Sequence, residues 1–280
     1  MLWRKLPWQR REEKKMLEIK NLSKTFNAGT VNAKTALDGL SLTLNDGDFV
    51  TVIGGNGAGK STLLNAIAGV FQPDTGDIIL DGVRLNGVPE HKRAKYLGRV
   101  FQDPMMGTAA NMQIDENLAL AKRRGAFRGM RWGITPSEHA EYRKLLLTLD
   151  LGLEDRLTSK VGLLSGGQRQ AVTLLMATLK QPKLLLLDEH TAALDPKTAA
   201  KVLDITEKIV SENKLTTLMI THNMRDAIRY GNRLIMMREG KVVVDVSGEA
   251  KQKLTVEALL ELFTKASGGD EFLSDRAILS

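Results

Sequence analysis

The chain has 280 residues, of which 42% are hydrophobic and none is cysteine, and its formal net charge is +7. This length is enough for one α/β domain with a small additional subdomain and a full core. Without cysteine the chain forms neither disulfides nor thiolate metal sites. No apolar run approaches the ~18 residues of a membrane span, and the N-terminus lacks the apolar segment of a signal peptide. We therefore expect no membrane span in this chain.

Much of the positive charge lies at the N-terminus. Residues 1–15 contain six basic and two acidic side chains, so this extension carries +4 and the rest of the chain only +3. Trp3, Leu6 and Trp8 are interleaved with the basic residues, as in segments that lie on anionic membranes, where each basic residue contributes about 1 kcal/mol. The alternatives are a solvated tail, or an upstream start before a true beginning at Met16. Because residues 16–280 are nearly balanced in charge, we expect no nucleic-acid partner.

The first predicted elements are antiparallel strands. Residues 17–22 and 40–44 carry apolar side chains at strand spacing, and a turn at residues 45–47 leads into the apolar, β-branched run of residues 49–53.

A glycine-rich loop follows this run and precedes the helix-like residues 61–68. Glycines let backbone N–H groups turn toward an anion, and a helix N-terminus adds roughly half a positive charge. In this strand, loop and helix context, Lys60 is expected to reach the β- and γ-phosphates of a nucleotide, and Ser61 to offer its hydroxyl to Mg²⁺. The alternative is a turn that binds nothing. The predicted nucleotide contacts are Gly54, Gly55, Asn56, Gly57, Ala58, Gly59, Lys60, Ser61 and Thr62.

Gln102 follows the apolar run of residues 97–101, and the region from there to Ser165 is predicted to be helical, with helices at residues 114–121 and 138–151. Residues 122–133 interrupt the pattern with glycines and five cationic side chains. They are predicted to form an exposed loop, with a nucleic-acid patch as the alternative.

A second helix start suited to an anion lies at Ser165, Gly166 and Gly167, about a hundred residues after the first. Ser165 is a good N-cap for the predicted helix at residues 168–179. A generic helix start is the alternative. The two helix starts either converge on one nucleotide or serve two nucleotides shared between two chains.

Two acids end the apolar run of residues 184–187, which has the composition of a strand buried on both faces. Ligands of open α/β sheets lie outside the carboxyl ends of the strands. Asp188 is therefore expected to hold Mg²⁺ through water, and Glu189 to orient and deprotonate the attacking water. A solvated turn is the alternative. His222 follows the run of residues 215–221 at the same edge, so it and Gln102 are predicted to sense the γ-phosphate rather than to make structural hydrogen bonds only.

The C-terminal part is predicted to form a hairpin at residues 233–246, turning at Glu239 and Gly240, and a helix at residues 256–263. No internal repeat is visible.

Taken in order, these segments resemble the nucleotide-binding subunit of an ATP-binding cassette (ABC) transporter over residues 16–261. The resemblance implies an α/β fold, a RecA-like P-loop NTPase core with an antiparallel β subdomain and an inserted helical subdomain. It divides the chain into the extension 1–15, the ABC ATPase domain 16–265 with its helical subdomain at about 103–165, and the tail 266–280. ATP and Mg²⁺ are the implied ligands.

The resemblance also implies roles for particular residues. Phe26 would stack on adenine, Glu189 would be the catalytic base and His222 the switch histidine. Mg²⁺ would be held by Ser61, Gln102 and Asp188. Two cassettes pair head to tail in this family, so the signature of one chain would act on the nucleotide of the other. The residues concerned are Ser165, Gly166, Gly167 and Gln168 of the signature and Asp195 of the D-loop.

The sequence departs from the family pattern at two positions. His190 stands where many members have proline, and we expect it to make a local hydrogen bond in the turn after Asp188, a direct contact with nucleotide being the alternative. Phe26 stands where tyrosine is more common, which keeps the aromatic face.

The resemblance predicts an ATPase that powers the import of a small solute through a separate membrane permease. The run of residues 188–196 is similar to amino-acid importers, including a tryptophan and tyrosine group. The implied partners are the permease, a second copy of the chain and, indirectly, an extracytoplasmic substrate-binding protein, and the implied location is the cytoplasmic face of the cell membrane. A lipoprotein-release or cell-division cassette is the alternative. Chromosome and repair cassettes need long heptad arms, and translation cassettes come in tandem, which this sequence does not show.

Overall fold

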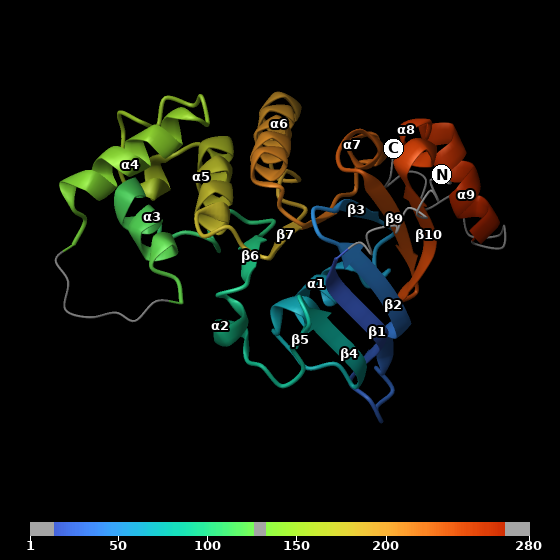
Figure 1. Cartoon of the computed structure of the whole chain (residues 1–280). Helices are drawn as coiled ribbons and strands as arrows, with labels where there is room; N and C mark the ends of the chain where they lie inside the picture. The colour runs from blue at the N-terminus through green and yellow to red at the C-terminus, as the bar shows by residue number, and fades with distance from the viewer. Residues whose placement is uncertain (1–13, 126–132, 267–280) are drawn as a thin grey trace, which may run out of the picture.

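The computed structural model describes residues 14–125 and 133–266, which form two β-sheets and a group of helices beside them (Figure 1). Most of the predicted N-terminal extension, the centre of the predicted basic loop and most of the predicted tail lie outside the described residues. Within the described ranges, no helix combines the length and the apolar character that crossing a membrane requires.

The first sheet is antiparallel, as predicted, and consists of β1 (Lys15–Phe26), β2 (Lys34–Asn45), β4 (Thr75–Leu80) and β5 (Val83–Arg84) in the order β2-β1-β4-β5. Leu17, Ile19 and Leu22 of β1 are all buried. A shift in register between Ile19 and Leu22, with Asn21 at a φ of 48°, returns Leu22 to the inner face, which is the effect of a bulge. The sequence did not predict β4.

The second sheet has six strands in the order β10-β9-β3-β8-β7-β6. Five strands are parallel, β3 (Phe49–Ile53), β6 (Leu97–Val100), β7 (Leu184–Asp188), β8 (Thr217–Ile220) and β9 (Arg233–Arg238), and β10 (Lys241–Ser247) is antiparallel to β9. The predicted hairpin is confirmed. Its turn residues Glu239 and Gly240 have φ values of 48° and 75°, which suit the right-handed twist of the flanking strands.

Helix α1 (Lys60–Ala68) is packed between the two sheets, because its buried residues Leu63, Leu64 and Ile67 belong to one hydrophobic core with the inner residues of both. A second core joins the far face of the parallel sheet to α5 (Gly166–Thr178) and α6 (Pro196–Asn213). The remaining helices are α2 (Glu90–Arg93), α3 (Ile114–Lys122), α4 (Pro136–Leu147), the 3₁₀ turn η1 (Val161–Leu163), α7 (Met224–Arg229), α8 (Gly248–Gln252) and α9 (Val256–Ala266). Figure 1 shows α3 and α4 beside α5, apart from the antiparallel sheet.

The predicted helix at residues 114–121 is confirmed as α3, whereas the second helix ends four residues before its predicted end. Helix α4 begins early because Thr135 and Glu138 cap it reciprocally. It stops at Leu147 because the hydroxyl of Thr148 donates to the carbonyl of Leu145 at 2.7 Å, and Asp150 then takes a φ of 51°.

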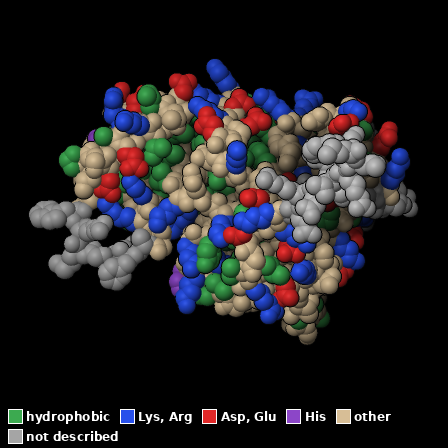
Figure 2. Space-filling view, in the orientation of Figure 1, with side chains coloured by type: hydrophobic (Ala, Val, Ile, Leu, Met, Phe, Trp, Pro, Cys, Tyr) green, Lys and Arg blue, Asp and Glu red, His purple; other side chains and the backbone are tan. Residues whose placement is uncertain are grey.

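Basic and acidic side chains are intermixed over the face of the molecule seen in Figure 2. This distribution agrees with the near balance of charge in residues 16–280.

Arg93 is fully buried at the end of α2, and its guanidinium donates to four backbone carbonyls. Its Nη1 donates to the carbonyls of Ala66 and Ile67 at 2.8 Å each, and its Nε and Nη2 donate to Val88 and Leu85, also at 2.8 Å. Ala66 and Ile67 lie in the last turn of α1, where carbonyls lack the partners of the helix interior. The carbonyl of Ala66 also accepts from the N–H of Gly69 at 3.2 Å. Arg93 therefore fixes the end of the helix that begins in the glycine-rich loop.

Replacing this arginine should destabilise the fold. Arg93→Met removes one donor from each of four carbonyls, of which Ala66 and Leu85 keep a backbone donor. It also removes a buried side chain, and we expect a loss of at least about 3 kcal/mol in the free energy of unfolding. Urea unfolding followed by circular dichroism measures it. The control is Arg84→Met, at an exposed arginine paired with Asp77, where the expected loss is below about 1 kcal/mol. Equal losses in the two variants would show that Arg93 is replaceable.

Candidate active site

The glycine-rich loop leaves β3 and runs close to neighbouring backbone. Gly54 and Gly59 have φ values of 153° and 98°. A Cβ would lie 2.3 Å from the carbonyl oxygen of Met237 at the first position and 2.4 Å from that of Ala36 at the second. Both positions therefore require glycine for conformation and for space.

Helix α1 begins at Lys60 directly after this loop, and no side chain caps its N-terminus. The first N–H groups of the helix are therefore available to an anion, which the helix dipole also attracts. Lys60 is only 5% exposed, and its Nζ donates to the carbonyls of Gly54 and Gly55 at 2.7 and 3.0 Å. This arrangement holds one buried positive charge at the N-terminus of the helix.

The loop forms one wall of a cavity of about 440 Å³. The cavity brings together residues from β1, β2, the loop, and the ends of β7 and β8. They are Phe26, Lys34, Ala36, Asn56, Gly57, Ala58, Gly59, Lys60, Ser61, Thr62, Glu189 and His222. Most of the residues predicted from the sequence to contact nucleotide therefore lie around one volume. Lys34 was not predicted, and its Nζ would be 3.3 Å from a Cβ at Gly57.

Asp188 ends β7 beside α1. Burial raises the pKa of Asp188, and the nearby Arg99, a hydrogen bond from Ser61 and the charge of Lys60 act in the opposite direction. Arg99 was not predicted as a site residue, and its Nη2 lies 3.6 Å from Oδ2 of Asp188.

The hydroxyl of Ser61 and the carboxylate of Asp188 are hard oxygen donors, which Mg²⁺ prefers. In residues 14–125 and 133–266, no three His, Cys, Asp or Glu side chains gather as a metal site. These donors therefore fit a Mg²⁺ ion that keeps waters and phosphate oxygens among its ligands, rather than one enclosed by protein alone.

Glu189 follows Asp188 in a strained conformation, with a φ of 46°. Its N–H donates to the carbonyl of Ile220 at 3.1 Å, which holds the residue at the end of β8. Its Oε1 lies 2.5 Å from Nε2 of His222, and the Glu189 side chain is 11% exposed. Non-glycine residues in the left-handed region are enriched at functional sites. The fold thus joins the ends of β7 and β8 through this carboxylate and imidazole.

Gln102 lines a different cavity from Lys60, Glu189 and His222. This second cavity has a volume of about 700 Å³ and contains Gln102 together with Asp188, Arg99, Glu90 and Phe101. Asp188 and Gln102 thus line the same cavity, and neither is in the lining of the first one.

The second predicted anion site is the N-terminus of α5. Ser165 is its N-cap, as predicted, and forms a reciprocal capping box with Gln168 at 3.2 and 3.3 Å. Gly167 is packed against α6, where a Cβ would lie 2.1 Å from Cγ2 of Thr198. Asp195 caps α6 by accepting from the N–H of Thr198 at 3.1 Å. None of the signature residues lines the first cavity of its own chain.

His190 makes a hydrogen bond with a helix rather than within its own turn. Its Nε2 lies 3.1 Å from the hydroxyl of Thr206 on α6, and the residue is 2% exposed. Because that hydroxyl donates to the carbonyl of Val202 at 2.8 Å, its oxygen accepts from His190, which fixes the neutral tautomer with the proton on Nε2.

Burial lowers the pKa of His190 to about 4, below its ordinary value of 6.5. The folded state therefore favours neutral histidine. Its contribution to stability is present above pH 6.5 and is lost as the pH falls toward 4. We expect His190→Gln to reduce the decline in the free energy of unfolding over this window by up to about 3 kcal/mol. Chemical unfolding at several pH values measures it. The control is His91→Gln, at an exposed histidine of α2, which should decline as the wild type does. An unchanged decline in His190→Gln would contradict the assignment.

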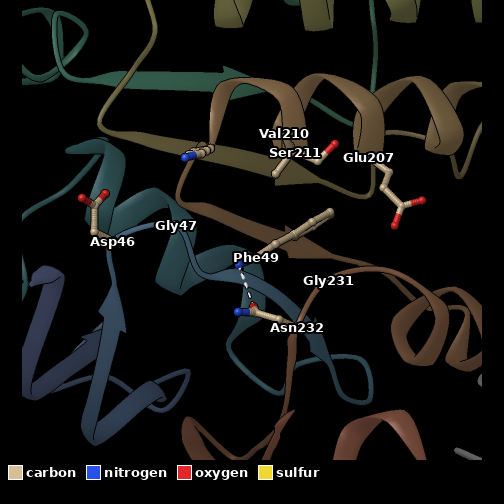
Figure 3. Close-up of a pocket in the computed structure, with 9 residues that line it drawn as sticks. Asp46, Gly47, Phe49, Glu207, Val210, Ser211, Gly231 and Asn232 are labelled. Carbon is tan, nitrogen blue, oxygen red and sulfur yellow. Dashed lines mark hydrogen bonds between the residues drawn. The ribbon is translucent and has the colours of Figure 1, made fainter. Parts of the chain in front are cut away.

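A third cavity of about 480 Å³ lies at the opposite end of β3 from the glycine-rich loop (Figure 3). There the N–H of Phe49 donates to Oδ1 of Asn232 at 2.9 Å. Since β3 begins at Phe49 and enters the loop after Ile53, this cavity is separate from the predicted nucleotide site.

A family model described as ABC transporter matches residues 37–192. The chain is 47% identical to the tyrosine transport ATP-binding protein of Clostridioides difficile (strain R20291), over 90% of this chain and 100% of that protein. It is 32% identical to a spermidine/putrescine import ATP-binding protein of Haemophilus influenzae, over 84% of this chain and 59% of that longer protein. The chain belongs to the ABC transporter family, as an ATP-binding protein.

Solved structures agree with this assignment. An ATP-binding cassette determined as a dimer in a post-hydrolysis state, bound to ADP and Pi, matches with a TM-score of 0.71 and 30% identity over 83% of this chain and 98% of its own. The ADP conformation of another ABC transporter cassette matches with a TM-score of 0.72 and 26% identity over 89% of this chain and 98% of its own. The predicted P-loop NTPase fold is confirmed, and the chain is an ABC-type ATPase that binds nucleotide.

Proposed function

We propose that this ATPase powers the import of an amino acid through separate membrane permease subunits, at the cytoplasmic face of the cell membrane. The observation that carries the ATPase part is the cavity that joins Lys60, Ser61, Glu189 and His222. The 47% identity to a tyrosine transport ATP-binding protein over that protein's whole length supports an amino acid as the cargo. An extracytoplasmic substrate-binding protein would deliver it to the permease.

The side chains of the first cavity divide the work of hydrolysis. Phe26, 37% exposed at the cavity rim, offers an aromatic face to adenine. Lys60 and the N-terminus of α1 bind the phosphates. Glu189 orients the attacking water and takes its proton, while His222, 2.5 Å away, holds that carboxylate in place. Mg²⁺, held by Ser61 and Asp188 and contacted by Gln102, would neutralise charge on the phosphates.

Two copies of the chain would close on two nucleotides. Ser165 and Gly166 are exposed at the N-terminus of α5 and do not line their own chain's cavity. They can therefore face the nucleotide of a second copy. The resemblance to the family implies this head-to-tail pairing. The similar cassette determined as a dimer with ADP and Pi supports this arrangement. The helical region at residues 103–165, beside Gln102, would receive the permease.

The cargo is tested with the assembled complex. The chain is purified from its native membrane in mild detergent, the retained membrane protein is identified, and the complex is reconstituted in vesicles with its substrate-binding protein. We expect ATP-dependent uptake of labelled tyrosine that unlabelled tyrosine or tryptophan reduces. A retained partner that shows no amino-acid uptake and instead releases lipoproteins from the membrane would favour the alternative cassette class.

A further inference from the structure

Arg99 on β6 lines the 700 Å³ cavity that also contains Asp188 and Gln102. Its Nη2 is 3.6 Å from Oδ2 of Asp188, and the two side chains are only 13% and 15% exposed. The same Nη2 donates to Oδ1 of Asn65 on α1 at 2.6 Å. Because β6 and β7 pair in parallel with Arg99 opposite Leu186, the arginine reaches the carboxylate at the end of the neighbouring strand.

We propose that Arg99 is the resting counter-ion of Asp188 and competes with Mg²⁺ for that carboxylate. A carboxylate that is this well covered needs a compensating charge when no metal is present. Arg99 supplies one positive charge 3.6 Å from the carboxylate that would help hold the metal. The inference rests on the proposed function, because it assigns a regulator to the same nucleotide site.

The surroundings of Arg99 offer its guanidinium a second position, away from Asp188. It lies 4.4 Å from the centroid of the Phe101 ring, and both residues line the 700 Å³ cavity together with Glu90. The charge of Glu90 also acts on Arg99. Within the described residues, the buried Nε of Arg99 has no hydrogen-bond acceptor. When Mg²⁺ takes Asp188, Arg99 can therefore move toward Glu90 and keep Asn65 and the aromatic face.

A purely structural role for Arg99 makes a different prediction. An arginine that only ties β6 to α1 through Asn65 would affect folding and leave the affinity for a metal ion unchanged. A competing cation changes the affinity for the metal ion directly. Removing Arg99 raises that affinity, and removing Glu90, which attracts Arg99, lowers it. Metal affinity therefore separates the two roles.

The test measures binding of Mn²⁺, as a probe for Mg²⁺, by electron paramagnetic resonance in the presence of a non-hydrolysable ATP analogue. We expect Arg99→Gln to bind Mn²⁺ about tenfold more tightly than the wild type, because one competing charge is gone. Glu90→Gln, at an exposed position where folding is not at risk, should bind it a few-fold more weakly, since Arg99 then stays on Asp188. Arg84→Gln, at an exposed arginine paired with Asp77, should bind as the wild type does.

Unchanged Mn²⁺ affinity in Arg99→Gln, or tighter binding in Glu90→Gln, overturns the role of Arg99 even when the wild type hydrolyses ATP with Mg²⁺. Should Arg99→Gln fail to fold, the sign of the effect in Glu90→Gln still decides. Absence of ATP hydrolysis in the wild type overturns the proposed function, and this inference with it.

Discussion

Replacing Glu189 by glutamine should almost abolish ATP hydrolysis while leaving nucleotide binding intact. Glutamine keeps the size of the side chain and removes the base that takes a proton from water, and loss of a general base typically lowers the rate ~10²- to 10⁴-fold. Because ATP then persists in the site, the variant should accumulate as an ATP-bound dimer. Phosphate release measures turnover, and size-exclusion chromatography with ATP and Mg²⁺ measures the dimer.

The matched control is Glu212→Gln, at an exposed position of α6. It should hydrolyse ATP at the wild-type rate and remain monomeric under the same conditions. If Glu189→Gln also turned over at the wild-type rate, the water would have to be deprotonated by another group, and the pair formed by Glu189 and His222 would have a structural role only.

Two further variants, Lys60→Ala and Ser165→Arg, should both be inactive, but for different reasons. Lys60→Ala removes a buried charge from the phosphate site and should weaken ATP binding by ~10²-fold or more. Ser165→Arg adds bulk and charge at the exposed N-terminus of α5, so it should leave ATP binding by the single chain unchanged and block closure of the dimer. Each variant alone should lack hydrolysis. Fluorescent ATP binding and phosphate release distinguish the two defects.

Mixing the two inactive variants tests whether the site is shared. In a mixed dimer, one composite site carries both defects and the other carries neither. Random pairing should therefore restore about a quarter of the wild-type activity at most, since half of the dimers are mixed and each has one intact site. Activity that never returns on mixing, together with wild-type turnover that is independent of protein concentration, would contradict the shared site.

Much of the nucleotide site is predictable because its parts are local. The glycine loop and the N-cap at Ser165 follow from short runs of sequence, and Gly54 and Gly59 prove to need glycine for both conformation and space. The apolar run before Asp188 identifies a buried strand, and the rule that ligands lie at the carboxyl ends of strands places its acids. Glu189 and most of the glycine loop accordingly line one cavity.

The contacts that sequence reasoning missed depend on pairing between distant segments. Arg99 reaches Asp188 only because β6 and β7 are neighbours in a particular register. Lys34 reaches Gly57 only because β2 packs beside the loop. Strand β4 was missed for a related reason. Its apolar residues are three consecutive ones at its end, with no alternating pattern, and its pairing with β1, almost sixty residues away, makes it a strand.

His190 shows the limit of reasoning from a turn alone. The prediction of a hydrogen bond was right in kind, but its partner Thr206 comes from α6, which no pattern in the turn indicates. The histidine is buried by that helix, so its chemistry is set by tertiary packing rather than by the residues beside it.

The shared site is tested most directly by a disulfide between two chains. Because the chain has no cysteine, Ser165→Cys and Asn56→Cys can be introduced together in the Glu189→Gln background without competing thiols. We expect oxidation in the presence of ATP and Mg²⁺ to produce a covalent dimer on non-reducing electrophoresis, and neither single-cysteine variant nor the nucleotide-free protein to do so. Cross-linking that is absent with ATP, or equal with and without it, would contradict the closure of one chain's signature over the nucleotide of the other.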